Sequence, residues 1–84
     1  MTQPQATHWS ASLQAETREL IESRGEHFRS LDVNLHFKNI DGRYGSMSLF
    51  DLYRGELYVI DKRDSRRCDF ADVDDLLAAG WAID

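Results

Sequence analysis

Apolar residues recur at intervals of three and four near the start of the chain, which is the period of an α-helix. One stripe of the predicted helix comprises Trp9, Leu13, Thr17, Leu20 and Ile21. Charged and amide side chains fill the positions between them. The pattern predicts an amphipathic helix over residues 10–24, with Ser10 or Ser12 as its N-cap and Gly25 after its last turn.

The next apolar residues alternate strictly with polar ones, which is the period of a β-strand. Between Leu31 and Lys38, one side carries Leu31, Val33, Leu35 and Phe37. This alternation predicts a half-buried strand. The pair Asp41-Gly42 follows and favours a two-residue hairpin turn, because both residues tolerate positive φ. Such a turn pairs Ile40 with Arg43.

The stretch Met47–Ile60, with the sequence MSLFDLYRGELYVI, is the most apolar part of the chain. It predicts two strands joined by a tight turn at Arg54-Gly55, which pairs Phe50 with Val59. The two turns then agree on one buried side, made of Leu31, Val33, Leu35, Phe37, Phe50, Leu52, Leu57 and Val59. Because a slip of one residue in either turn would break this agreement, the registers together predict a three-stranded antiparallel meander.

The opposite side of this meander carries a second group of large side chains. Its two later strands present Met47, Leu49, Asp51, Tyr53, Tyr58 and Ile60. Exposed aromatic and methionine side chains are typical of protein interfaces. We therefore predict a protein interface that comprises Met47, Leu49, Tyr53, Tyr58 and Ile60. The alternative is that a helix covers this side and makes it a second small core.

The C-terminal third predicts a charged connector and a second helix. The connector runs from Asp61 to Arg67, and the helix runs from Asp69, as its N-cap, to about Ala79 before Gly80. The element order α-β-β-β-α predicts an α+β fold, a three-stranded antiparallel meander with two helices packed on one face. Residues 1–9 are expected to form a flexible N-terminal tail, and residues 10–84 a single domain.

Charge is unevenly distributed along a chain whose formal net charge is −5. The last predicted helix carries an acidic patch of Asp69, Asp72, Asp74 and Asp75. The connector before it carries a candidate anion contact of Lys62, Arg63, Arg66 and Arg67. An acidic chain gains little from counterion release on a polyanion, so nucleic acid is an unlikely partner and a basic protein a better one.

Residues with catalytic or metal-binding chemistry are few and scattered. His8, His27 and His36 lack the spacing of a metal site, and the single Cys68 has no cysteine partner. We find no phosphate-binding glycine loop and no catalytic triad, so neither a metal, a cofactor nor an enzyme is predicted. A lone cysteine and the lack of a leader or a membrane-spanning run favour a cytoplasmic protein.

The element order resembles that of double-stranded RNA-binding domains, but only in the order of the elements. Those domains hold phosphates with a lysine-rich start to the last helix, whereas this helix begins with Asp69 and Asp72. Element order alone does not carry function.

These features favour a small acidic protein-interaction module that acts by stoichiometric binding. Motif-free acidic proteins of this size include inhibitors, immunity proteins and antitoxins, some of them phage-encoded, and carboxylates suit a basic, nucleic-acid-binding target. Two alternatives remain at this point. One is a nucleic-acid-binding domain that uses the basic loop at residues 62–67, and the other is a structural homodimer module.

Overall fold

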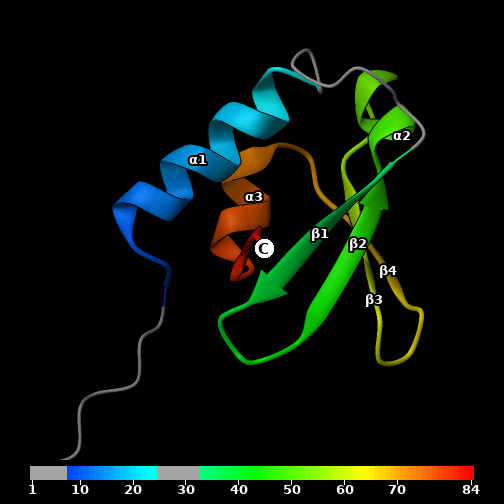
Figure 1. The fold of residues 1–84 in the computed structure, drawn as a ribbon. Helices are drawn as coiled ribbons and strands as arrows, with labels where there is room; N and C mark the ends of the chain where they lie inside the picture. Colours follow the sequence, from blue (N-terminus) through cyan, green and yellow to red (C-terminus); the bar gives the residue numbers. More distant parts are fainter. Residues whose placement is uncertain (1–7, 25–32) are drawn as a thin grey trace, which may run out of the picture.

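A computed structural model describes residues 8–24 and 33–84 and has an α+β fold with one antiparallel sheet. In chain order the elements are α1 (Ala11–Glu22), β1 (Asn34–Asn39), β2 (Tyr44–Ser48), α2 (Leu49–Tyr53), β3 (Tyr58–Asp61), β4 (Arg67–Asp69), α3 (Val73–Ala78) and β5 (Trp81–Ile83) (Figure 1). The five strands lie in the order β4-β3-β2-β1-β5. The predicted α+β class is confirmed, and the meander is widened by a strand at each edge.

The first helix follows its predicted pattern. Ser10 is the N-cap, and its hydroxyl oxygen accepts a hydrogen bond from the Leu13 amide at 3.2 Å. Thr17 and Ile21 are buried on the apolar stripe. The predicted end of the helix at Gly25 and the predicted strand start at Leu31 lie outside the described residues.

The turn between β1 and β2 differs from the prediction by one residue. Asn39 and Arg43 close the hairpin through a 2.8 Å hydrogen bond from the Asn39 amide, so the loop has three residues, Ile40 to Gly42. Gly42 has a φ of 97°, as three-residue hairpin loops require at this position. This shift pairs Leu35 with Met47 and turns the whole of β2 over, because side chains alternate between faces.

The predicted tight hairpin at Arg54-Gly55 is also wrong. The second strand ends at Ser48, and a short helix, α2, follows before the chain returns as β3. Ser48 caps this helix, since its side chain accepts from the Asp51 amide at 3.5 Å. The helix changes the pairing so that Ser46 faces Ile60 and Gly45 faces Asp61. Val59 nevertheless stays on the buried side, as predicted.

The C-terminal third holds two strands that were not predicted. Asp69 ends β4 rather than capping a helix, and Asp72 caps the shorter α3 by accepting from the Asp75 amide at 2.9 Å. Gly80, with a φ of 92°, ends this helix region as predicted. The chain then forms β5, in which Trp81 pairs with Asn39 of β1.

Helices α1 and α3 lie together on one side of the sheet, next to β5 (Figure 1). The hydrophobic core cluster contains Ile21, Leu35, Phe37, Met47, Leu49, Leu52, Tyr58, Val59, Val73, Leu76 and Trp81. The opposite face of β1, β2 and β3 is not covered by α1 or α3, and α2 contacts it at Tyr58 of β3 (Figure 1). The fold therefore has two different surfaces, a helical one and an open sheet face.

Candidate functional site

The predicted apolar interface is largely inside the molecule. Met47 and Leu49 are 1% and 0% exposed, so the prediction of an outward apolar face is wrong for these two. Tyr58 lies on the predicted side of the sheet but is buried there. Ile60 is half-buried and packs against the core. Tyr53 alone remains on the surface, where it is 59% exposed. The flipped register of β2 and the helix α2 account for the difference.

Tyr58 lies on the face of the sheet away from α1 and α3, yet other side chains cover it. The Arg67 guanidinium lies 3.9 Å from the centroid of its ring. Its hydroxyl donates to the Asp51 carboxylate and accepts from the Ser48 amide at 3.4 Å. Burial, followed by the bond to Asp51, raises the pKa of Tyr58 above its ordinary value. This ring fastens α2 to the sheet and is not free for a partner.

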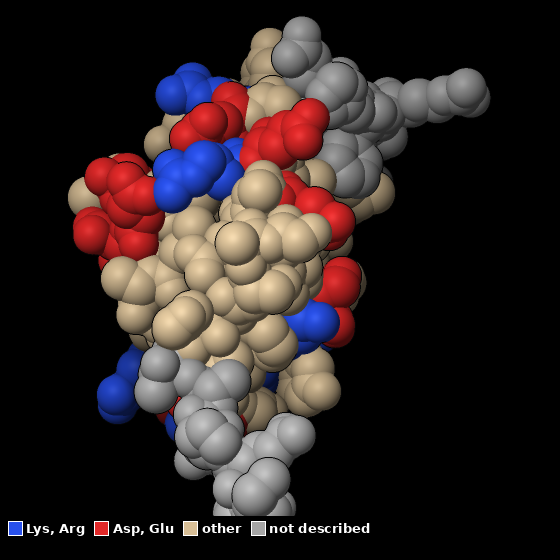
Figure 2. Space-filling view, turned by 90° about the vertical axis from the view of Figure 1, so that its left-hand side faces the viewer, with Lys and Arg blue, Asp and Glu red and all other residues tan. Residues whose placement is uncertain are grey.

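The predicted acidic patch is divided by the fold. Asp69 lies on β4 and pairs with Arg67 at 2.9 Å, whereas Asp72, Asp74 and Asp75 lie on or next to α3. Arg18 of α1 forms an ion pair with Asp74 and another with Glu22, and the hydrogen bond to Asp74 raises its pKa. Acids from α1 and α3 therefore share one side of the molecule, beside a broad uncharged surface (Figure 2).

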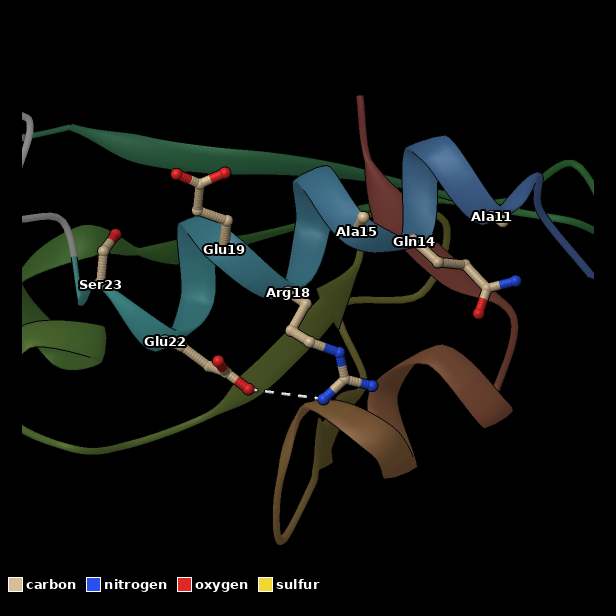
Figure 3. Close-up of a pocket in the computed structure, with 7 residues that line it drawn as sticks. All are labelled: Ala11, Gln14, Ala15, Arg18, Glu19, Glu22 and Ser23. Carbon is tan, nitrogen blue, oxygen red and sulfur yellow. Dashed lines mark hydrogen bonds and ion pairs between the residues drawn. The ribbon is translucent and has the colours of Figure 1, made fainter.

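The outer surface of α1 is shallow and open. Figure 3 shows the side chains that line it, with Arg18 reaching from α1 across to the ribbon of α3; they are Ala11, Gln14, Ala15, Arg18, Glu19, Glu22 and Ser23. The hollow has a volume of about 570 Å³ but no enclosing walls. Active sites are usually enclosed and apolar, so this shape suits contact with another surface better than it suits a small molecule.

A second hollow, which we call the three-helix groove, lies where α1, α2 and α3 meet. Its lining comes from three parts of the chain and comprises Ile21, Glu22, Arg24, Leu52, Gly55, Glu56, Leu57, Ala71, Asp72 and Val73. The volume is about 310 Å³. The groove has apolar side chains on its floor and three carboxylates against one arginine around it. Sequence reasoning missed it, because the predicted strand pair contained no α2.

Exposed aromatic side chains lie on α2, the helix that supplies Leu52 to this groove. Phe50 and Tyr53 are 49% and 59% exposed, and residues three apart on a helix lie on neighbouring parts of its surface. The Arg54 guanidinium lies 5.8 Å from the Phe50 ring centroid. Val33 is also exposed. It lies next to the start of α2, because the Leu49 amide donates a hydrogen bond to the Val33 carbonyl at 3.0 Å. Of these, sequence reasoning predicted only Tyr53.

The predicted anion contact is not a single cluster. Arg67 pairs with Glu56 and Asp69 and covers Tyr58. Arg63 lies 3.7 Å from Asp61, and Lys62 Nζ lies 3.0 Å from His36 Nδ1. Arg66 is exposed in the turn between β3 and β4. The basic residues therefore contact different neighbours, although Lys62 and Arg63 line a common hollow.

Groups that could hold a metal ion are not assembled in the described part of the chain, where no three His, Cys, Asp or Glu side chains cluster suitably. Cys68 is a half-buried free thiol. None of the described helices has the length and apolar character needed to cross a membrane.

Comparison with known proteins adds no relative to this picture. No family model, no curated protein and no solved structure matches the chain.

Proposed function

We propose that this chain is a protein-interaction module, which acts by stoichiometric binding rather than by catalysis and takes a basic protein as its partner. The observation that carries the proposal is the three-helix groove, which joins an apolar floor to an acidic rim. Part of the rim, Glu22 and Asp72, is continuous with the acids of α1 and α3.

The groove fits the shape and chemistry of a lysine or arginine side chain. Such a side chain lays its methylene stem on apolar surface while its charged head reaches a polar rim. Here Ile21, Leu52 and Val73 offer the apolar surface, and Glu22 and Glu56 offer the carboxylates. A charged donor on a carboxylate forms a stronger hydrogen bond than a neutral pair does. A basic partner therefore gains both kinds of contact at one place.

Exposed aromatics beside the groove extend the contact area. Tyr53 and Phe50 lie on α2, the element that supplies Leu52 to the groove. Tyrosine, phenylalanine and arginine are enriched in the buried centres of interfaces, where they supply much of the binding energy. In this proposal Tyr53 keeps the role predicted for it, while Phe50 replaces the buried Met47 and Leu49.

The finer proposal is that binding inhibits the partner. Carboxylates on the rim imitate phosphates, so a nucleic-acid-binding protein of the cytoplasm is the best class of target. Inhibitors, immunity proteins and antitoxins, including phage-encoded ones, work by such occlusion. A second copy of this chain is the competing occupant, because the aromatics of α2 are exposed in the single chain.

The experiment compares two variants of equal charge. A short peptide of alternating arginine and leucine is titrated into the labelled protein, and amide shifts are followed by NMR. The groove variant carries Glu22→Gln and Glu56→Gln, and the control carries Glu16→Gln and Glu19→Gln, which lie on α1 outside the groove. We expect the groove variant to bind about five- to tenfold more weakly, since each exposed carboxylate contributes up to about 1 kcal/mol. The control should stay within about twofold of the unmodified protein.

Several results would count against the proposal. Equal weakening of both variants would mean that only net charge attracts the peptide. Shifts confined to residues away from Ile21, Leu52 and Val73 would place binding elsewhere. Sedimentation of the pure protein tests whether a second copy of the chain occupies this surface instead. A dimer that dissociates in the Tyr53→Asp variant would mean that it does.

A further inference from the structure

The face of the sheet opposite α1 and α3 carries an aromatic side chain between two lysines. Lys38 of β1 pairs with Tyr44 of β2, and the Lys62 amide at the end of β3 donates to the Tyr44 carbonyl at 2.9 Å. These three neighbours share one face, because paired residues of an antiparallel sheet point the same way. The Tyr44 side chain is 53% exposed. A stacking surface thus stands between two cations.

Neither lysine is neutralised by a carboxylate of the described chain. The ion pairs of the described residues involve arginines, and none includes Lys38 or Lys62. Lys62 Nζ contacts a histidine nitrogen, His36 Nδ1, at 3.0 Å, and Lys38 Nζ lies 5.0 Å from the centroid of the Trp9 ring. Their charges therefore remain available to an anion that approaches this face.

A hollow adjoins the exposed ring. It has a volume of about 410 Å³ and is lined by Asp41, Gly42, Arg43, Tyr44, Lys62 and Arg63. Three of these residues are cations and one is an acid. The sheet face and the hollow together combine an aromatic platform with positive charge, which is the combination that holds single-stranded nucleic acid.

The negative net charge of the chain does not oppose such a ligand, because the charge lies elsewhere. Helices α1 and α3, with the cap of α3, hold six acids and one base, so they carry −5; the acids are Glu16, Glu19, Glu22, Asp72, Asp74 and Asp75, and the base is Arg18. The whole chain also sums to −5, so everything outside these helices is neutral overall. These acids belong to α1 and α3, which lie on the other side of the sheet (Figure 1).

We propose that the open sheet face binds single-stranded nucleic acid, with one base stacked on Tyr44 and the flanking phosphates on Lys38, Lys62 and Arg63. A duplex fits less well, because a base must leave its own stack to reach an aromatic side chain. The site is independent of the three-helix groove. One molecule can therefore hold a strand on the sheet while a protein occupies the helices.

The test uses fluorescence anisotropy with a labelled oligothymidylate of about ten nucleotides, the length that one such surface covers. Tyr44→Leu should weaken binding by at least about fivefold, the loss expected for one stacked base. Tyr44→Phe should restore it to within about twofold, because the ring face is kept. The matched control is Tyr53→Leu, an equally exposed tyrosine on α2, and it should leave binding unchanged. Thermal unfolding checks that each variant is folded.

The lysines are tested by salt dependence. The double variant Lys38→Gln with Lys62→Gln should flatten the slope of log affinity against log salt by about 1.4, or about 0.7 for each phosphate that no longer meets a lysine. Oligouridylate in place of oligothymidylate tells RNA from DNA, and either strand supports the proposal if Tyr44 is needed.

Four results would overturn the inference. They are no binding of either strand at low salt, equal losses in Tyr44→Leu and Tyr53→Leu, a duplex that binds as well as a single strand, and a polyglutamate peptide that binds as tightly as the oligonucleotide. The last would identify the face as a site for acidic protein instead. The variant with Glu22→Gln and Glu56→Gln should bind the strand normally, so failure of the groove and failure of the sheet face are distinguishable.

Discussion

Asp61 is a carboxylate on the inner face of the sheet, and its partners are well matched to a negative charge. Its side chain is only 4% exposed, and it accepts from the Arg63 amide at 2.8 Å and from Arg43 Nη1 at 3.3 Å. Opposite it, in the pairing of β2 with β3, stands Gly45. A methyl group there would lie 2.3 Å from Val59 Cγ1, so only glycine fits beside this packing.

The Asp61 partners predict a specific response to acid. The hydrogen bond from the Arg63 amide, with help from Arg43, lowers the pKa of Asp61 below its ordinary value of 3.8. A lowered pKa means that Asp61 stabilises the fold above about pH 4 and that this stabilisation is lost as the pH falls through the folded-state pKa. We expect Asp61→Asn to reduce the steepness with which the free energy of unfolding falls below about pH 4.

Urea unfolding at a series of pH values measures this slope. Asp41, whose pKa is also lowered by the amide of Arg43, continues to titrate, so the slope should shrink rather than vanish. Asp64→Asn, in the exposed turn after β3, is the control. Identical slopes for Asp61→Asn and the unmodified protein would show that Asp61 does not contribute to the acid response.

At the scale of elements, hydrophobic periodicity does not distinguish between two arrangements of the stretch Met47–Ile60. The same apolar residues fit two adjoining strands, and they also fit a strand followed by one helical turn. The two arrangements bury different residues of the stretch. The sequence did hold a signal for the helix: Ser48 stands three residues before Asp51, as in N-terminal caps. Read with that cap, the stretch predicts α2 and leaves Phe50 outside.

Adjacent residues of α2 give opposite expectations for the two arrangements. In the structure, Leu49 is fully buried and Phe50 is half exposed, whereas a straight strand pair would bury Phe50 and expose Leu49. We expect Leu49→Ala to lower the free energy of unfolding by about 2–5 kcal/mol, through lost transfer energy and the cavity left behind. Phe50→Ala should change it by about 0.5 kcal/mol or less.

Chemical denaturation of the two variants decides between the arrangements, and each variant serves as the control for the other. A reversed order, with Phe50→Ala the more damaging, would restore the tight hairpin at Arg54-Gly55. Equal effects would contradict both arrangements.

At the scale of the whole molecule, the two ends of the described chain are fastened together. The Trp9 indole nitrogen donates to the Gly80 carbonyl at 2.8 Å, and the Ile83 amide donates to the Thr17 hydroxyl at 3.0 Å. Helix α1 therefore packs on β5, the last strand, and covers the core there. Such contacts between distant parts of a sequence favour cooperative unfolding.

We expect urea unfolding to follow a single transition, which tests the prediction of one domain over residues 10–84. Tryptophan fluorescence reports the α1–β5 region through Trp9 and Trp81, and far-ultraviolet circular dichroism reports all helices and strands. The two curves should coincide, as they do for two-state domains. A fluorescence change that precedes the loss of secondary structure would mean that α1 and β5 separate from an otherwise folded sheet.

The sequence by itself determined the features that depend on neighbours along the chain. Ser10 capping α1, the inward side of β1, the break at Gly80 and the α+β class all follow from local periodicity and capping, whose causes lie within a few residues. Tyr53 was likewise placed on the surface from its position in the pattern, although for a different local structure.

Tertiary structure alone decided the register and, with it, the surfaces. Side chains alternate between faces, so the extra residue in the loop from Ile40 to Gly42 was enough to move Met47 from the expected outside into the core. The edge strands β4 and β5 were too short for a periodic signal and form only because β3 and β1 offer hydrogen-bonding partners. The three-helix groove and the row of Lys38, Tyr44 and Lys62 exist only after those pairings, because their residues come from separate parts of the chain.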